Sequence, residues 1–257
     1  MKVFIQIILL LAFNNPTFCD EPPTSQKPKD IKEIMNLLEH GNETTRWYTL
    51  SSLIHHAHEK EWDLFSPEVE EKIRLLLSKD ESTIVRADAA YLLGRLSQAG
   101  KLLNKEEAVT EALIKKLKYD LSQGVRHSAI YALGIIKSNK AIEALVNDLS
   151  KEPVYEEQRY IVSTLKGIDE ELKKLAKTDE EKNKVINTLE TAIKNWKLKK
   201  DQSEADKSAV FTAIDLIKVL KSREPPCSVV TEAERSEGDI KKASKTTPAS
   251  PLPQQKP

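Results

Sequence analysis

Apolar residues recur at helical spacing through most of residues 30–222. In the segment 67–79, for example, Val69, Ile73 and Leu77 lie on one face of a helix with 3.6 residues per turn. Residues that can cap a helix N-terminus stand ahead of several such segments; they are Asp30, Ser66, Asn104, Asn139, Thr178 and Ser203. The pattern therefore predicts an all-α chain of short amphipathic helices.

One part of this pattern occurs twice in the same register. Asp80–Gly94 and Asp120–Gly134 share Asp, Val-Arg, Ala and Leu-Gly, with a separation of 40 residues at each shared position. The segments 71–77, 111–117 and 143–149 echo one another in turn, since each begins with Glu and ends with Leu. A fixed period of this length is typical of α-solenoids, in which each helical hairpin buries its apolar face against its neighbours. We predict an α-solenoid of about four helical hairpins with terminal capping helices over residues 30–222.

Small and apolar residues of the repeat fit this arrangement. We interpret Leu93 and Leu133 as core residues of the seam between hairpins, because they recur at the same register position. Gly94 and Gly134 follow them directly, and the absence of a side chain there permits close packing on the next helix.

The N-terminal residues 1–19 have a different character. They combine one charged residue, an apolar run of about eleven residues and small residues at Thr17 and Cys19, a pattern typical of a cleaved signal peptide. The run is too short to cross a bilayer, which takes about 20 residues. A lipid anchor at Cys19 is the weaker interpretation, because Phe18 stands where such motifs have a small residue. We expect an exported protein, periplasmic or secreted, with no transmembrane segment after cleavage.

Two further segments contain Pro and polar residues but few large apolar ones. We predict that residues 20–29 form a flexible leader and that residues 223–257 form a disordered tail, since neither can bury enough surface to offset the entropy of ordering. Cleavage of the signal peptide leaves Cys227 as the single thiol, so an internal disulfide is not expected. Asn42 begins a glycosylation sequon, which matters only in a eukaryotic source.

The charge balance excludes some classes of partner. The chain has 40 basic and 40 acidic residues and a formal net charge of zero at pH 7. No global field therefore favours nucleic acid or an anionic membrane. We expect a protein or peptide partner, no nucleic acid, and a monomeric chain.

The shared pattern Asp-x4-Val-Arg-x2-Ala-x3-Leu-Gly resembles the HEAT repeat, especially the short HEAT-like form found in bilin lyases. The resemblance covers roughly residues 29–168 and implies the solenoid fold. It also implies that the Asp caps a helix and that the Arg pairs with the Asp of an adjacent repeat, a ladder that Asp80, Arg86, Asp120 and Arg126 match.

The ladder is expected to be incomplete at both ends. His40 stands in the acidic position ahead of Arg46, so that repeat keeps only half of the motif. The acid that should align ahead of Arg159 is missing. We therefore expect the end repeats to depart from the pattern.

Histidines 55, 56 and 58 form the one histidine cluster of the sequence. His55 and Glu59 are four residues apart on one helical face, a spacing that can hold a divalent metal. No Cys and no second His-rich segment completes such a site, so we interpret the cluster as a solvated helix end. We expect neither a metal nor a cofactor.

The resemblance also raises two enzyme classes. Deoxyhypusine hydroxylases are HEAT-like iron enzymes with His-Glu pairs in several repeats, but here the pair occurs once, at His58-Glu59. Bilin lyases act in the cytoplasm, whereas this chain has the pattern of an exported protein. The sequence has no Gly-rich phosphate loop and no nucleophile elbow. We expect a non-enzyme, with a HEAT-like lyase or oxidoreductase as one alternative and a structural envelope component as another.

Function is expected on the second helix of each hairpin, because second helices usually line the concave groove of a solenoid. Buried leucines in these helices leave one outward column of polar residues: Glu71, Arg74, Glu111, Lys115, Glu143 and Asn147. We call this set the second-helix strip. Our hypothesis is a non-catalytic scaffold that binds a protein or peptide through the strip, although such Glu–Lys spacings also occur on ordinary solvated helices.

Overall fold

The computed structural model describes residues 30–102, 106–150, 155–199 and 201–222. The predicted signal peptide 1–19, the leader 20–29, the tail 223–257 and the predicted cap Asn104 lie outside the described residues. The described residues up to Val219 belong to one compact unit.

The described residues form eleven α-helices and no strand, which confirms the prediction of an all-α chain. In chain order they are α2 (Ile31–His40), α3 (Glu43–His58), α4 (Pro67–Lys79), α5 (Thr83–Gln98), α6 (Glu106–Tyr119), α7 (Gln123–Ile136), α8 (Asn139–Leu149), α9 (Tyr155–Gly167), α10 (Asp169–Leu175), α11 (Asp179–Leu198) and α12 (Glu204–Lys221).

Local sequence sets the ends of several helices. Asp30 and Ser66 cap α2 and α4 through their side chains, and Thr178 forms a capping box with Glu181 at the start of α11. The prediction that Asn139 caps α8 is wrong by one residue. Lys137 adopts a left-handed conformation, with φ 58°, that ends α7, and the extended Ser138 then accepts a hydrogen bond from the Ala141 N–H at 3.3 Å.

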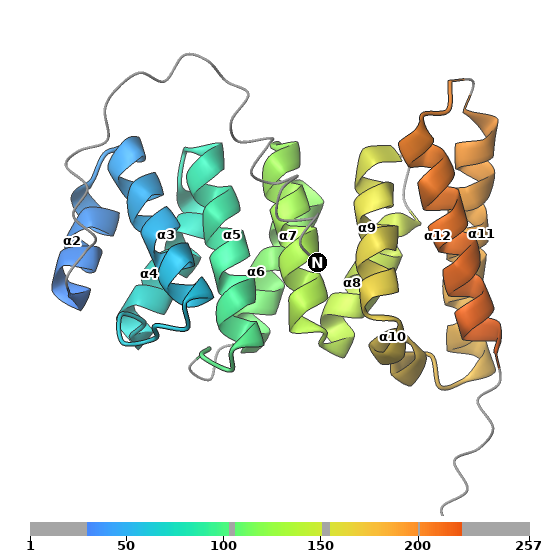
Figure 1. Ribbon diagram of the computed structural model, residues 1–257, viewed down its shortest axis with the longest axis horizontal. Coiled ribbons are helices and arrows are strands. Elements are labelled where there is room, and N and C mark those ends of the chain that lie inside the picture. The colour runs from blue at the N-terminus through green and yellow to red at the C-terminus, as the bar shows by residue number, and fades with distance from the viewer. Residues whose placement is uncertain (1–29, 103–105, 151–154, 200, 223–257) are drawn as a thin grey trace, which may run out of the picture. The chain divides into compact units, whose positions relative to one another are not determined.

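The helices stack as hairpins in two layers (Figure 1). In the first layer α3, α5, α7 and α9 pack side by side, and in the second layer α4 packs against α6 and α6 against α8. Helix α2 packs on α3 and α4 at the N-terminal end. The hairpins α3–α4, α5–α6, α7–α8 and α9–α10 make the chain an α-solenoid, as predicted.

Close approach in the first layer depends on two glycines. A Cβ atom at Gly94 of α5 would lie 2.8 Å from the backbone Cα of Ala132 on α7. A Cβ atom at Gly134 of α7 would overlap the Thr164 methyl group on α9. Leu93 and Leu133, directly before these glycines, are 0% exposed. The first helices therefore contact each other nearly backbone to backbone.

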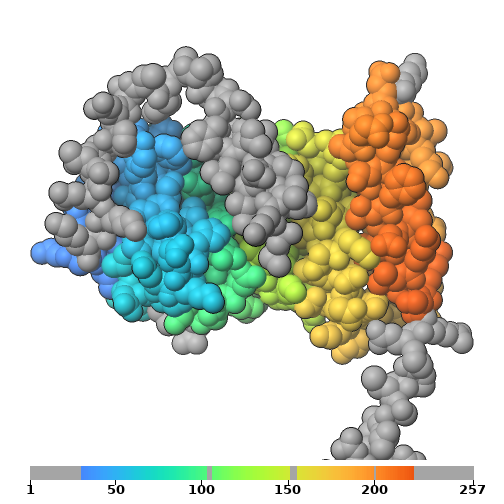
Figure 2. Space-filling model, viewed as in Figure 1, coloured from blue at the N-terminus to red at the C-terminus, as the bar shows by residue number. Residues whose placement is uncertain are grey.

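In the last helical pair the order of the two layers is reversed: the earlier helix, α11, lies in the second layer, and the later helix, α12, lies in the first. Helix α10 has only seven residues and packs against α9, while α11 packs against α8 in the second layer. Helix α12 then returns to the first layer, where Lys166 of α9 contacts Asp215 with Nζ and Oδ2 2.9 Å apart. The space-filling view shows α12 beside α9 (Figure 2). The fourth hairpin thus has a shortened second helix, and α11 takes the next place in that layer.

Candidate functional site

Arginine and acidic side chains join successive first helices. Arg46 of α3 donates from Nε and Nη2 to the Asp80 carboxylate at 2.7 and 3.0 Å. Arg86 of α5 makes the same two-point contact with Asp120, at 2.9 Å for both bonds. The Nη1 group of Arg86 also donates to the carbonyl of Asp80 at 2.8 Å, in the turn that precedes its own helix. Each arginine therefore ties its own turn to the turn of the next repeat.

This arginine–acid ladder continues beyond the two matched repeats. Arg126 of α7 pairs with Glu157 of α9, and Arg159 of α9 pairs with Asp206 of α12 at 2.7 Å. The end repeats depart from the sequence pattern, as expected, but their arginines are still paired: Arg46 with the acid of the following repeat and Arg159 with an acid on a later helix. The arginine occupies the same position in each repeat, whereas the acid that pairs with it lies in a turn for the first two pairs and within a helix for the last two.

Asp80 is the C-cap residue of α4, but neither Asp80 nor Asp120 is the N-cap of the helix that follows it. The cap residues are Ser82 for α5 and Ser122 for α7. Instead, the Oδ1 atom of each Asp accepts a hydrogen bond from the backbone N–H of the serine two residues later. The N···O distance is 2.9 Å for Asp80 and 3.0 Å for Asp120. The carboxylate stands two residues ahead of the cap, where it can hold the turn and still reach the arginine.

The electrostatics of Asp120 indicate a structural role. Burial raises the pKa of this carboxyl, but hydrogen bonds from Arg86, the Ser122 N–H and Lys116 outweigh burial and lower the pKa to about 2. The Asp120 side chain is 3% exposed and lies 3.1 Å from Lys116 Nζ. Arg86 and Lys116 both pair with the Asp120 carboxylate, so its charge is balanced by groups of the protein itself.

The second-helix strip lies on α4, α6 and α8. Glu111, Lys115, Glu143 and Asn147 are exposed, while Glu71 and Arg74 are partly buried. Glu71 pairs with Arg74 one turn along α4. Glu111 reaches across to the next second helix, where Lys140 Nζ lies 2.5 Å from its Oε1. The strip is therefore a polar surface in which part of the charge is already paired between neighbouring helices.

Aromatic rings form a second surface, on the first helices. His58 of α3, Tyr91 of α5 and Tyr131 of α7 follow one another, and the two tyrosine rings stack with centroids 5.2 Å apart and planes 10° apart. His127 of α7 packs on Tyr160 of α9 with ring centroids 3.9 Å apart. We call these five residues the aromatic row; His58 is exposed and the other four are partly exposed.

Burial shifts the titration of several groups in this row. It raises the pKa of Tyr91 to about 12, with a smaller contribution from Tyr131. It also lowers the pKa of His127 to about 4, so this imidazole is neutral at pH 7. The Tyr91 hydroxyl lies 3.1 Å from Nε2 of His58. At neutral pH the row therefore presents uncharged rings, with Arg95 at its edge close to His58.

The aromatic row was not predicted from the sequence. Tyr91 and Tyr131 are 40 residues apart, at the repeat period, and that recurrence was the available signal. His58 and Tyr160 have no such relation to Tyr91 and Tyr131, and only the stacking of the helices brings them into the row.

The histidine cluster divides between two environments. His56 is 8% exposed, and its Nδ1 lies 2.5 Å from Oε2 of Glu61. His55 and Glu59 are exposed at the end of α3. Among the described residues, no group of three or more His, Cys, Asp or Glu side chains is placed to hold a metal ion.

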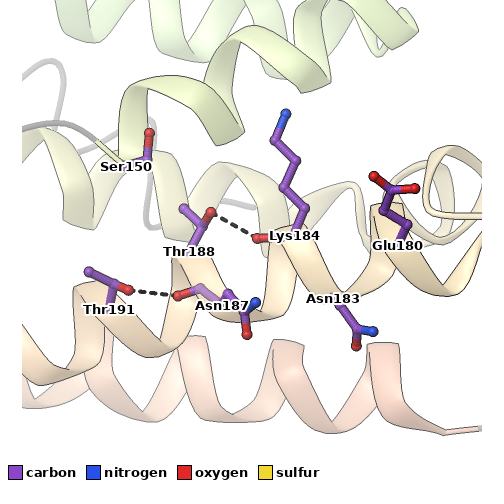
Figure 3. A pocket seen from close by; sticks show the side chains of 7 residues that line it. All are labelled: Ser150, Glu180, Asn183, Lys184, Asn187, Thr188 and Thr191. Atoms are coloured by element: carbon purple, nitrogen blue, oxygen red, sulfur yellow. Dashed lines mark hydrogen bonds between the residues drawn. The ribbon is translucent and has the colours of Figure 1, made fainter.

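A depression with a volume of about 580 Å³ lies along α11 (Figure 3). Ser150 and six residues of α11 line it: Glu180, Asn183, Lys184, Asn187, Thr188 and Thr191. The two threonine hydroxyls donate to carbonyls of their own helix, at 2.9 Å for Thr188 and 2.8 Å for Thr191. The depression is open and polar, and its hydroxyls are used within the helix.

A smaller depression of about 320 Å³ adjoins the ladder at Asp120, Arg126 and Glu157. Its rim carries Leu121, which is 97% exposed, and Tyr119, which is 73% exposed. Three of its charged groups are paired: Arg126 with Glu157, and Asp120 with Arg86 and Lys116.

Comparison with known proteins identifies the repeats. Residues 69–166 match the family of HEAT repeats, and this match does not single out the bilin-lyase form. No curated protein matches the chain. In the described part of the chain, no helix has both the length and the apolar character needed to cross a membrane. The matched segment spans α4 to α9, the part of the solenoid that carries the central rungs of the ladder. Residues 69–166 are therefore similar to HEAT repeats, and the chain has the fold of a helical repeat scaffold.

Proposed function

We propose that this helical repeat protein is a non-catalytic scaffold that binds a protein or peptide partner along its solenoid. The observation that carries the proposal is the aromatic row, in which His58, Tyr91 and Tyr131 follow one another across α3, α5 and α7. Tyrosine rings provide large contact areas at a low cost in side-chain entropy, and they are enriched at binding interfaces. Solenoids commonly present such surfaces to extended partners.

The second-helix strip is the alternative surface for the same function. Its exposed residues Lys115, Glu143 and Asn147 could contact a charged partner, but Glu111 is already paired with Lys140. Breaking an exposed pair costs little, so the pairing does not exclude the strip. The aromatic row is favoured because its rings offer apolar contact area as well as polar groups.

A crosslinking experiment separates the two surfaces. The photoreactive residue p-benzoylphenylalanine replaces Tyr131 in one variant, Lys115 in a second and the exposed Lys218 of α12 in a control. Each purified full chain is irradiated with cell extract from the source organism. We expect a discrete adduct from position 131, suppressed by excess unlabelled protein. The same adduct from position 115 alone would move the site to the second-helix strip, and adducts equal at all three positions would contradict specific binding.

Substitutions then test the surface that crosslinks. With p-benzoylphenylalanine kept at position 131, the variant Tyr91→Ser should lose the adduct while its helical circular dichroism stays unchanged. The triple variant Glu111→Lys, Lys115→Glu, Glu143→Lys should retain it. The opposite pattern would assign binding to the strip, and full retention in both variants would refute both surfaces.

We also propose that the scaffold is exported. Support comes from the residues 1–19, whose apolar run and small residues at Thr17 and Cys19 are typical of a cleaved signal peptide. N-terminal sequencing of the protein from fractionated cells should find Asp20 as the first residue, in a fraction outside the cytoplasm. A chain that begins at Met1 in the cytoplasmic fraction would overturn this proposal.

A further inference from the structure

Arg95, in the last turn of α5, differs from the other arginines in the described part of the chain. Five of those arginines pair with an acid: Arg46, Arg74, Arg86, Arg126 and Arg159. No ion pair among the described residues involves Arg95. A partly buried guanidinium therefore lies beside the aromatic row without the carboxylate that the others have.

Uncharged groups hold the Arg95 side chain in place. Its Nη1 group donates to Oε1 of Gln98, and its Nη2 group lies 3.4 Å from Nδ1 of His58. The Nε group is buried and has no hydrogen-bond partner. Since each terminal nitrogen of a guanidinium carries two N–H groups, one N–H at Nη1 and one at Nη2 have no acceptor among the described residues. These are the donors that a ligand can use.

The neighbouring His58 adds no negative charge. Burial, and then the charge of Arg95, lower the pKa of His58, so its imidazole is neutral at pH 7. Its Nδ1 can then accept from Arg95, while Nε2 lies 3.1 Å from the Tyr91 hydroxyl. The C-terminal end of α5 also interacts favourably with a cation in its last turn. Neither interaction provides a counter-ion for the guanidinium.

The free donors and the adjoining rings fit one kind of ligand. A carboxylate can accept two parallel hydrogen bonds from a guanidinium group. Tyr91 and Arg95 both contact His58, and Tyr131 stacks on Tyr91, so a ring surface adjoins the cation. We propose that Arg95, with His58 and Tyr91 beside it, binds the side-chain carboxylate of an Asp or Glu residue in the partner peptide. The inference rests on the proposed function, because it names the chemistry by which a peptide would bind the aromatic row.

A phosphate group fits this place less well than a carboxylate. A phosphorylated side chain carries about −1.5 to −2 charges at pH 7, and phosphate groups are typically bound by clusters of arginines. Here the residues in contact with the guanidinium are a neutral histidine and a glutamine. The charge of a single carboxylate balances that of Arg95.

The site can be tested without knowing the partner. N-acetyl-glutamate N-methylamide is titrated into the ¹⁵N-labelled full chain at pH 7 and constant ionic strength. The Nε–H signal of Arg95, assigned with Arg95→Lys, is followed by NMR. We expect a saturable shift of this signal, while the Nε–H signal of Arg86, already paired with Asp120, stays unchanged.

Two further compounds serve as controls. N-acetyl-glutamine N-methylamide has nearly the same shape without the charge, and it should produce no shift. Inorganic phosphate should bind more weakly than the glutamate compound. Equal shifts with the glutamate and glutamine compounds, no shift with glutamate, or tighter binding of phosphate would each overturn the proposal.

Variants then connect the site to the partner. With p-benzoylphenylalanine at position 131, Arg95→Gln should lose most of the adduct while its helical circular dichroism stays unchanged. Arg74→Gln removes an arginine that is already paired with Glu71 on α4, and it should leave the adduct unchanged. Full retention in Arg95→Gln would refute the site. If the partner crosslinks at position 131 but the glutamate compound does not bind, the proposed function stands and this inference fails. If the compound binds but no partner crosslinks, the carboxylate site stands and the proposed function fails.

Discussion

Arg159 of α9 and Asp206 of α12 form an ion pair across 47 residues of sequence, with Nη1 and Oδ1 2.7 Å apart. Asp206 also accepts hydrogen bonds from Lys199 Nζ at 2.8 Å and from Ser203 Oγ at 2.8 Å. Burial raises the pKa of Asp206, but these donors outweigh it and hold the pKa well below its usual range. This one carboxylate connects the ladder to the reversed helix pair α11–α12.

Replacing Asp206 should therefore destabilise the C-terminal end of the solenoid. Asp206→Asn leaves Arg159 and Lys199 without a shared counter-charge and should cost about 3–5 kcal/mol, the usual loss when one partner of a buried pair is removed. The free energy of unfolding is measured by urea titration at pH 7. As a control, Glu204→Gln removes an exposed acid of the same turn, whose side chain is 89% exposed, and should have little effect. Equal losses in both variants would contradict a special role for Asp206.

Asp120 should make stability depend on pH in a defined window. Its pKa is about 2 in the folded chain, below the value of about 4 expected when unfolded, so the ionised form favours folding. Its contribution is complete above about pH 4 to 5 and is lost as the pH falls toward 2. The shift corresponds to about 2–3 kcal/mol. The difference in unfolding free energy between wild type and Asp120→Asn should shrink by most of this amount from pH 6 to pH 2.5; a difference independent of pH would refute the assignment.

The two glycines of the first layer should respond differently to alanine. Gly94→Ala places a methyl group against the backbone of Ala132, which cannot move aside, and should cost about 1–3 kcal/mol despite the higher helix propensity of Ala. Gly134→Ala meets only the Thr164 methyl group. Adding Thr164→Ser should therefore restore most of the stability lost in Gly134→Ala. Thermal unfolding of the single and double variants checks this, and a failure of the serine to rescue would indicate that the backbone of α9 limits the approach.

Leucines of the seam should contribute far more than exposed side chains. Leu93→Ala and Leu133→Ala each leave a cavity at a position that is 0% exposed, and each should cost about 2–5 kcal/mol. Lys115→Ala, on the exposed face of α6, should change the free energy by less than about 0.5 kcal/mol. Urea denaturation compares the three. A loss at Lys115 as large as at Leu93 would mean that the second-helix strip is part of the core.

Helix positions and the repeat were predictable because they depend on short-range relations. The apolar stripe of α4 and its start at Ser66 and Pro67 follow from residues within one or two turns of each other. The arginine of each rung was recognisable for a related reason. Arg86 and Arg126 occupy one register position in a repeated helix, so they reach the same place in each hairpin.

The acids that complete the outer rungs were not predictable in this way. Glu157 lies inside α9, and Asp206 lies on a helix 47 residues beyond its arginine, at no repeat position. Only the stacking of α12 on α9 brings Asp206 to Arg159, and that stacking depends on a short α10 and on α11 packing against α8.

The sequence by itself determined the all-α class, the hairpin repeat, most helix starts and the identity of the buried seam, because periodicity and capping act within a few residues. Only the tertiary structure decided the aromatic row, the acids of the outer rungs and the reversed order of α11 and α12. The row joins side chains from α3, α5, α7 and α9. Such sets arise where helices from different repeats pack against each other, and no local pattern encodes the distance between them.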